Sequence, residues 1–171
     1  MEERMVKFYS KENNNLALHA IPGHFATSHS HINYYIDVTS MKARVKEAKE
    51  AAKVLYQKTG NPSYVDTVVC MDRTEMIGGF LAERFEQGDF MSTNLHETIY
   101  VISPEMNSSG QMIFRDNAKI MVEGKNVLIL STSITTGVTL DKAIDSVEYY
   151  GGKVQGIASI FSFISKARGV E

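Results

Sequence analysis

The chain has 171 residues, of which 43% are hydrophobic and 9% aromatic, and its formal net charge at pH 7 is −2. This length fits one domain with a sizeable core, and the near-neutral charge argues against nucleic acid or an anionic membrane surface as a partner. The single cysteine, Cys70, excludes an internal disulfide framework. With no apolar leader and no run long enough to span a bilayer, we expect a cytoplasmic protein with no membrane partner.

The segment Met1–Tyr35 has an irregular, polar pattern, so we expect no regular elements there. It contains three histidines, at positions 24, 29 and 31. His29 and His31 alternate in the way that lets two side chains of a strand point the same way, so a metal site is one interpretation. No cysteine or acidic residue stands at a matching spacing, so we expect no metal site and favour polar contacts at a site rim or a subunit interface.

A helix is predicted over Ser40–Thr59, where apolar residues recur at spacings of three and four. Ser40 is the expected N-cap, and Gly60 and Pro62 are expected to end the helix. The short β-branched run Val65–Met71 follows and predicts a buried strand. Cys70 lies inside this run, so we expect it to be a core residue and not a nucleophile.

The remainder of the chain continues to alternate between strand and helix patterns. The expected elements are a helix over Thr74–Gly88, a strand over Glu97–Ser103, a polar loop over Ser103–Asn117 with or without a hairpin strand at its end, a buried strand over Val127–Leu130, a helix over Thr139–Gly152 and a strand over Val154–Ile164. This order predicts an α/β fold, a mainly parallel central sheet with helices on both faces. In such sheets ligands bind at the carboxyl ends of the strands.

One turn stands at such an end, in the stretch VLILSTSITTGVTL (Val127–Leu140). An apolar strand is expected to stop at three hydroxyl residues, and a helix is expected to begin after Thr-Thr-Gly. Backbone N–H groups at a helix start bind anions well, and a glycine allows close approach of a ligand. The expected phosphate-binding residues are Thr135, Thr136, Gly137, Val138 and Thr139. A threonine-capped helix without a ligand is the other interpretation.

This stretch resembles the signature of the type I phosphoribosyltransferases, which is four apolar residues, two acidic residues, two small or apolar residues and Thr-Thr-Gly-x-Thr. Other segments are similar to the orotate phosphoribosyltransferase branch, and the resemblance runs from Gly23 to Ile164. These segments are HFATSHSHINYYID (His24–Asp37), VDTVVCMDRTEMIGGFLAERF (Val65–Phe85) and YVISPEMNSSGQMIF (Tyr100–Phe114), the last in place of the family's catalytic loop.

The resemblance implies a single domain over residues 1–171, with an N-terminal hood segment at 1–36 and an α/β core at 37–171. It implies a small-molecule phosphoribosyl ligand, either phosphoribosyl pyrophosphate (PRPP) with Mg²⁺ or a nucleoside monophosphate, in pyrimidine nucleotide metabolism. It also implies a homodimer. The matching positions put Ser131 and Thr132 at the ribose. The pyrophosphate loop would be Asp72, Arg73, Thr74 and Glu75.

The sequence departs from the family where the chemistry takes place. Ser131 and Thr132 stand where the family has its acidic pair, and Glu75 would repel pyrophosphate. Ser103–Phe114 contains no Lys, Arg or His, and the nearest cations are Arg115 and Lys119. Catalytic residues are therefore not assigned, and we expect little or no transfer of phosphoribose to orotate.

Three functions stay open on these grounds. The first is an active transferase, the second is a non-catalytic regulator that binds a nucleotide or sugar phosphate, and the third is a structural subunit. The intact Thr-Thr-Gly turn favours the first two, because a purely structural role does not require it.

Overall fold

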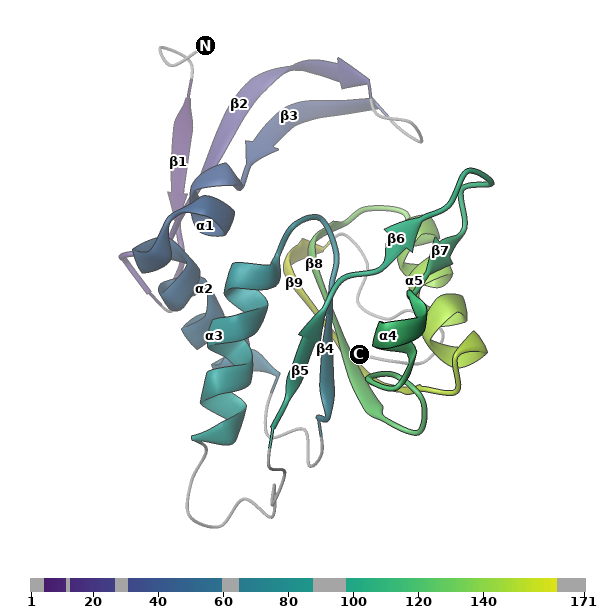
Figure 1. Ribbon diagram of the computed structural model, residues 1–171. Coiled ribbons are helices and arrows are strands. Elements are labelled where there is room, and N and C mark those ends of the chain that lie inside the picture. Colours follow the sequence, from purple (N-terminus) through teal and green to yellow (C-terminus); the bar gives the residue numbers. More distant parts are fainter. Residues whose placement is uncertain (1–4, 12, 27–30, 60–64, 88–97, 163–171) are drawn as a thin grey trace.

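The computed structural model describes residues 5–11, 13–26, 31–59, 65–87 and 98–162 and contains three sheets and five helices within them (Figure 1). The strands are β1 Val6–Tyr9, β2 Ala17–Ala26, β3 His31–Asp37, β4 Thr67–Cys70, β5 Tyr100–Ile102, β6 Glu105–Met106, β7 Met112–Ile113, β8 Asn126–Ile134 and β9 Lys153–Ser162. The helices are α1 Thr39–Ala43, α2 Val45–Lys58, α3 Glu75–Glu86, α4 Asp116–Lys119 and α5 Val138–Tyr149. No helix in these ranges is both long enough and apolar enough to cross a bilayer.

The central sheet has four parallel strands in the order β5-β4-β8-β9. Val68 of β4 stands beside Leu128 of β8, and Val69 stands beside Ile129. The prediction that Val127–Leu130 forms an inner strand parallel to the Val65–Met71 run is confirmed. β4 and the Val127–Leu130 run of β8 are fully buried, as strands covered on two faces require.

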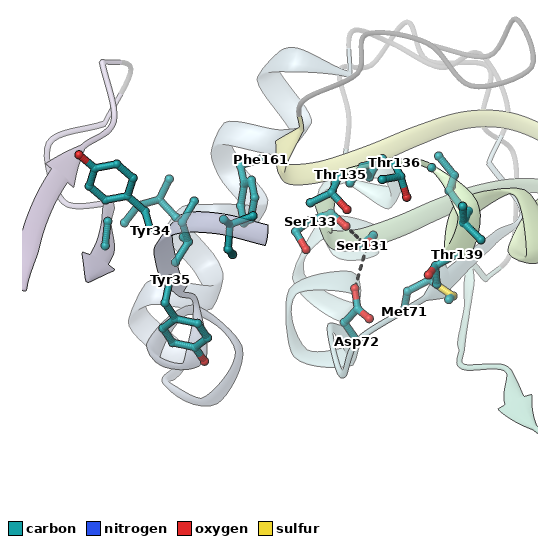
Figure 2. A pocket seen from close by; sticks show the side chains of 18 of the residues that line it. Tyr34, Tyr35, Met71, Asp72, Ser131, Ser133, Thr135, Thr136, Thr139 and Phe161 are labelled. Carbon is teal, nitrogen blue, oxygen red and sulfur yellow. Dashed lines mark hydrogen bonds between the residues drawn. The ribbon is translucent and has the colours of Figure 1, made fainter. Parts of the chain in front are cut away.

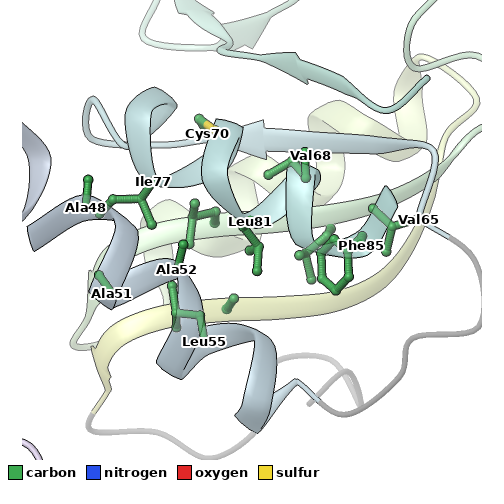
Figure 3. Packing of buried hydrophobic residues seen from close by; sticks show 14 of the residues in the cluster. Ala48, Ala51, Ala52, Leu55, Val65, Val68, Cys70, Ile77, Leu81 and Phe85 are labelled. Atoms are coloured by element: carbon green, nitrogen blue, oxygen red, sulfur yellow. The ribbon is translucent and has the colours of Figure 1, made fainter. Parts of the chain in front are cut away.

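Helices cover both faces of this sheet, as the alternation of the sequence predicts (Figure 1). Val68 and Leu128 belong to the hydrophobic cluster under α2 and α3. Their neighbours Val69 and Ile129 belong to the cluster under α5. Figure 3 shows the first cluster, in which α2 and α3 pack against each other and the sheet; its labelled residues are Ala48, Ala51, Ala52, Leu55, Val65, Val68, Cys70, Ile77, Leu81 and Phe85.

The prediction of an irregular N-terminal segment is wrong. β1, β2 and β3 form an antiparallel three-stranded sheet, the hood, which curves over the end of the core in Figure 1. The register of β2 on β3 shifts between Pro22 and Phe25, which breaks the regular pattern of the sequence. Within β3 the apolar residues alternate, at Ile32, Tyr34 and Ile36, but exposed polar and aromatic neighbours conceal this strand period.

The predicted helix over Ser40–Thr59 is two helices, because Arg44 has an extended backbone (φ −111°, ψ 125°). Ser40 lies inside α1 and does not cap it: its carbonyl accepts the N–H of Arg44 at 2.9 Å. The break gives each helix its own buried face, with Met41 in the core from α1. No glycine or proline marks this break in the sequence. Gly60 and Pro62 lie outside the described residues.

Three further boundaries differ from the predictions. β8 does not stop at the hydroxyl residues, because it continues to Ile134 paired with β9. The hairpin strand considered at the end of the Ser103–Asn117 loop is β7, which pairs with β6, and the short helix α4, which the sequence did not predict, begins at Asp116. α5 begins at Val138, one residue before the predicted start. The expected ends at Gly88, Glu97 and Ile164 lie outside the described residues.

Candidate functional site

The turn between β8 and α5 presents an uncapped helix N-terminus. Gly137 is the N-cap residue with φ 84°, in the left-handed region that glycine adopts freely, and no side chain caps the helix. The first N–H with a backbone partner is that of Asp141, which donates to the carbonyl of Gly137 at 2.8 Å. Thr135, Thr136 and Thr139 are exposed around this turn. The helix start therefore presents N–H groups and hydroxyls toward an anion.

This turn lines a cavity of about 740 Å³ between the hood and the carboxyl ends of β4 and β8 (Figure 2). A volume of this size lies within the range of small-molecule sites. All five residues predicted to hold phosphate line it: Thr135, Thr136, Gly137, Val138 and Thr139. Of the other predicted site residues, Ser131 and Asp72 line the cavity, whereas Thr132, Arg73, Thr74 and Glu75 do not.

The carboxylate of Asp72 lies against the two residues that replace the acidic pair. Its Oδ2 accepts hydrogen bonds from Ser131 Oγ at 2.8 Å, from Thr132 Oγ1 at 3.1 Å and from the Thr132 N–H at 3.3 Å. Asp72 is the only charged side chain among the described residues of the cavity wall. The described part of the cavity wall thus contains one carboxylate, and that carboxylate comes from the turn after β4.

The backbone of that turn is held in an unusual conformation. Asp72 and Arg73 have φ values of 56° and 62°, which cost free energy in residues other than glycine. Lys42 Nζ donates to the carbonyl of Asp72 at 3.0 Å. Thr74 is buried, and its hydroxyl donates to the carbonyl of Met71 at 2.7 Å. These contacts hold the turn so that the Asp72 side chain faces β8.

The remaining residues of the expected pyrophosphate loop do not assemble around the cavity. Glu75 Oε1 accepts a hydrogen bond from Ser103 Oγ at 2.7 Å, which ties the start of α3 to the end of β5. Arg115, the nearest cation to the catalytic-loop segment, forms an ion pair with Glu105 across the β6–β7 hairpin, with Nε 2.6 Å from Oε1. Positive charge at the place expected for pyrophosphate is therefore not preorganised in the described part of the chain.

Two other candidates from the sequence do not form a reactive site. His24 Nε2 and His31 Nδ1 lie 2.9 Å apart in the hood, and His29 lies outside the described residues. The described residues contain no group of three or more side chains that could hold a metal ion. Burial raises the pKa of the Cys70 thiol to about 12, so it is a protonated core residue, as predicted.

Sequence reasoning missed the hood side of the cavity. On this side the cavity is lined by Phe8 of β1 and Tyr34 of β3. Phe161 of β9, in the central sheet, also lines the cavity, and Figure 2 shows Tyr34 and Phe161 on its wall. The alternation of Ile32, Tyr34 and Ile36 was the available signal, but it is short and lies in a segment that otherwise has a loop-like composition.

No protein-family model matches the chain, and no curated protein is similar to it in sequence. Solved structures are similar to it in fold. An adenine phosphoribosyltransferase from Thermoanaerobacter pseudethanolicus has a TM-score of 0.56 at 14% identity, over 94% of this chain and 84% of that one. An orotate phosphoribosyltransferase from Aeropyrum pernix has a TM-score of 0.54 at 14% identity, over 84% and 88%.

A third structure is the orotate phosphoribosyltransferase of Mycobacterium tuberculosis H37Rv in complex with inorganic phosphate. It has a TM-score of 0.55 at 17% identity and covers 84% of this chain and 75% of that one. The fold of the chain is therefore that of the type I phosphoribosyltransferases, with a parallel central sheet and helices on both faces.

Proposed function

We propose that this protein, with its phosphoribosyltransferase fold, binds a phosphoribosyl ligand, either PRPP or a nucleoside 5′-monophosphate, with the 5′-phosphate at Thr135–Thr139. The observation that carries the proposal is the uncapped start of α5 at Val138 on the wall of a ligand-sized cavity. Unpaired N–H groups and the helix dipole favour an anion there. The M. tuberculosis neighbour, which was solved with inorganic phosphate, supports a phosphate ligand for this fold.

The ribose of such a ligand would lie beside Ser131 and Asp72. Oδ2 of Asp72 is used by the donors on β8, and its other oxygen, Oδ1, makes no hydrogen bond within the described part of the chain. Hydroxyl groups of a ribose donate well to such an oxygen. Thr132 then acts through Asp72, because its hydroxyl and N–H both position that carboxylate.

Magnesium fits this site only together with PRPP. Mg²⁺ is usually held by one or two carboxylates and by phosphate oxygens of the substrate. Asp72 is the carboxylate that would hold Mg²⁺, and the ion would neutralise part of the pyrophosphate charge. Because no cluster of three metal-binding side chains exists among the described residues, we expect no Mg²⁺ binding without PRPP.

A non-catalytic, regulatory binding protein is the form of this function that we favour. One carboxylate stands at the proposed ribose end in place of two, and Arg115 is paired with Glu105 across the β6–β7 hairpin. Transition-state stabilisation by such groups contributes on the order of 10²–10³ in rate for each group. Binding of the ground-state ligand depends mainly on the backbone of the α5 turn, so these changes affect it less.

A homodimer in the cytoplasm is part of the same proposal, and the resemblance to the orotate branch supports it. Size-exclusion chromatography with light scattering tests the homodimer, and a mass equal to one chain would exclude it at the concentration used. We expect no nucleic acid partner, given the formal charge of −2.

Calorimetric titration with uridine 5′-monophosphate, with uridine and with PRPP in the presence and absence of Mg²⁺ tests the proposal. The monophosphate should bind and uridine should bind at least about tenfold more weakly, because it lacks the phosphate. Failure of both phosphate ligands to bind would exclude the proposed function.

A pair of glycine variants separates the phosphate site from general strain. Gly137→Ala places a Cβ at φ 84° in the α5 turn and should weaken phosphate binding at least about tenfold. Gly124 also has a positive φ, 69°, with open space around it, and it does not line the cavity. Gly124→Ala should therefore cost similar stability and leave binding unchanged.

A further inference from the structure

The hood presents an apolar face to the phosphate-binding turn. Eight described hood residues line the cavity from this side, and all but Asn33 are apolar or aromatic: Phe8, Leu18, Ala20, Ile32, Asn33, Tyr34, Tyr35 and Ile36. The strand pairing places them together, because Phe8 stands beside Leu18 and Ala20 beside Ile36. Successive side chains of a strand point to opposite faces, so the alternating positions Ile32, Tyr34 and Ile36 share one face of the hood.

This apolar face belongs to the same cavity as the α5 turn. A ligand whose phosphate lies at Thr135–Thr139 and whose ribose lies near Asp72 therefore extends its base toward the hood. Phe161 of β9 adds a further aromatic ring to the wall. Aromatic and aliphatic walls favour a flat ring, through contact area and stacking.

The charge of the wall restricts the base further. No Lys, Arg or His is found among the described residues that line the cavity, and Asp72 is negatively charged. An anionic base would lose hydration beside apolar side chains, gain no ion pair from these residues and be repelled by Asp72. An uncharged base has none of these costs.

We propose that the ligand carries an uncharged planar base, and that an anionic base such as orotate is excluded. This inference rests on the proposed function, because the phosphate at the α5 turn is what directs the base to the hood.

Uridine 5′-monophosphate and orotidine 5′-monophosphate form a matched pair of probes, since they differ only in one carboxylate on the pyrimidine ring. Calorimetric titration should show orotidine 5′-monophosphate binding at least about tenfold more weakly. Ribose 5-phosphate, which has no base, should also bind more weakly than uridine 5′-monophosphate because it leaves the hood face uncovered.

A variant with a new cation tests the hood directly. Tyr34 is exposed (53%) on the edge strand β3 and lines the cavity, so Tyr34→Lys should fold. It should improve binding of orotidine 5′-monophosphate relative to uridine 5′-monophosphate by about fivefold, the size of an exposed ion pair. Tyr9→Lys is the control, since Tyr9 is exposed (61%) in the same sheet but does not line the cavity.

The outcomes separate this inference from the proposed function. Equal or tighter binding of orotidine 5′-monophosphate by the unmodified protein overturns the uncharged base and leaves phosphate binding intact. Equal binding of ribose 5-phosphate and uridine 5′-monophosphate shows that the hood does not contact the base, and so also overturns it. If no phosphate compound binds, the proposed function fails and the inference fails with it. A change in the ratio of the two nucleotides in Tyr34→Lys but not in Tyr9→Lys supports the inference.

Discussion

A carboxylate added on β8 should conflict with Asp72, and this conflict tests the geometry of the ribose end. In the structure Ser131 Oγ donates to Asp72 Oδ2 at 2.8 Å, and Ser131 is 7% exposed. The variant Ser131→Asp replaces this donor with a second negative charge. The charge cannot move far from Asp72, because β8 is paired on both sides, with β4 and with β9.

The expected cost follows from the separation of the two charges. Two carboxylates about 4 Å apart repel each other by about 4 kcal/mol at an effective dielectric constant of 20. Because Asp72 is on the solvent side of the pair, screening reduces this to about 2–4 kcal/mol. Loss of the Ser131 hydrogen bond adds about 1 kcal/mol. The repulsion and the lost hydrogen bond together amount to a large part of the free energy of unfolding of a marginally stable domain.

Urea denaturation of four proteins measures the effect as a double-mutant cycle: the unmodified chain, Ser131→Asp, Asp72→Ser and the double variant. Ser131→Asp should be strongly destabilising alone, whereas in the Asp72→Ser background the repulsion is absent and most of the cost should vanish. Ser131→Asn is the control for size without charge. Equal costs of Ser131→Asp in both backgrounds would show that Asp72 does not face Ser131, which would refute the geometry.

The pH dependence of the same variant has a defined sign. Repulsion raises the pKa of the introduced carboxyl in the folded protein above its unfolded value of about 3.9. The folded state then binds more protons than the unfolded state between the two pKa values, so stability rises as the pH falls. The deficit of Ser131→Asp should therefore be largest at pH 8 and smaller at pH 5. An equal deficit at both values would contradict electrostatic repulsion as its cause.

Other predictions concern the core and the chemistry. Gly78→Ala should destabilise the protein by about 1–3 kcal/mol, because the new methyl group would collide with Cys70 Sγ. Gly79→Ala has open space around it and should stabilise the protein by up to about 1 kcal/mol. Thermal denaturation of both variants measures the difference. Cys70, whose thiol has its pKa raised to about 12, should resist an aromatic disulfide reagent at pH 8 in the native protein and react after denaturation. In a PRPP-dependent assay the chain should not consume orotate above background, and robust turnover would show that the acidic pair absent at Ser131 and Thr132 is not required, with Asp72 and Glu75 the first candidates for the substituted charge.

The sequence predicts the sheet well because burial on both faces leaves a strong pattern. Val127–Leu130 and the Val65–Met71 run are continuous and β-branched, so strand type, parallel direction and inner position all follow. The hood segment was expected only from the family resemblance, and its three strands were not predicted from the residue pattern, because a sheet with one solvent-facing side has a mixed composition and its register shifts between Pro22 and Phe25. The break at Arg44 has no local signal, since it depends on how α1 buries Met41 in three dimensions.

The phosphate-binding turn follows from the sequence for a different reason. It needs a glycine with positive φ at 137 and a strand followed directly by a helix, and both requirements are local. The role of Asp72 is not local, because the residues that hold its carboxylate are Ser131 and Thr132, on a strand about 60 residues later in the chain. From sequence alone Asp72 could be assigned only to the turn after its strand, and its partner could not be identified.

If the proposed function holds, the position of Asp72 would make ligand binding and catalysis separable in this site. The phosphate depends on backbone N–H groups, which any sequence that forms the same strand, turn and helix supplies. A positive charge that develops on the ribose is stabilised by nearby carboxylates. Asp72 is the only carboxylate among the described residues of the cavity wall, and its Oδ2 already accepts three hydrogen bonds. Those donors hold the carboxylate in place, but they also reduce the negative potential that it presents to a ligand. One carboxylate that already accepts three hydrogen bonds is sufficient to accept a ribose hydroxyl, and it is a weak substitute for two that are free to stabilise a cation.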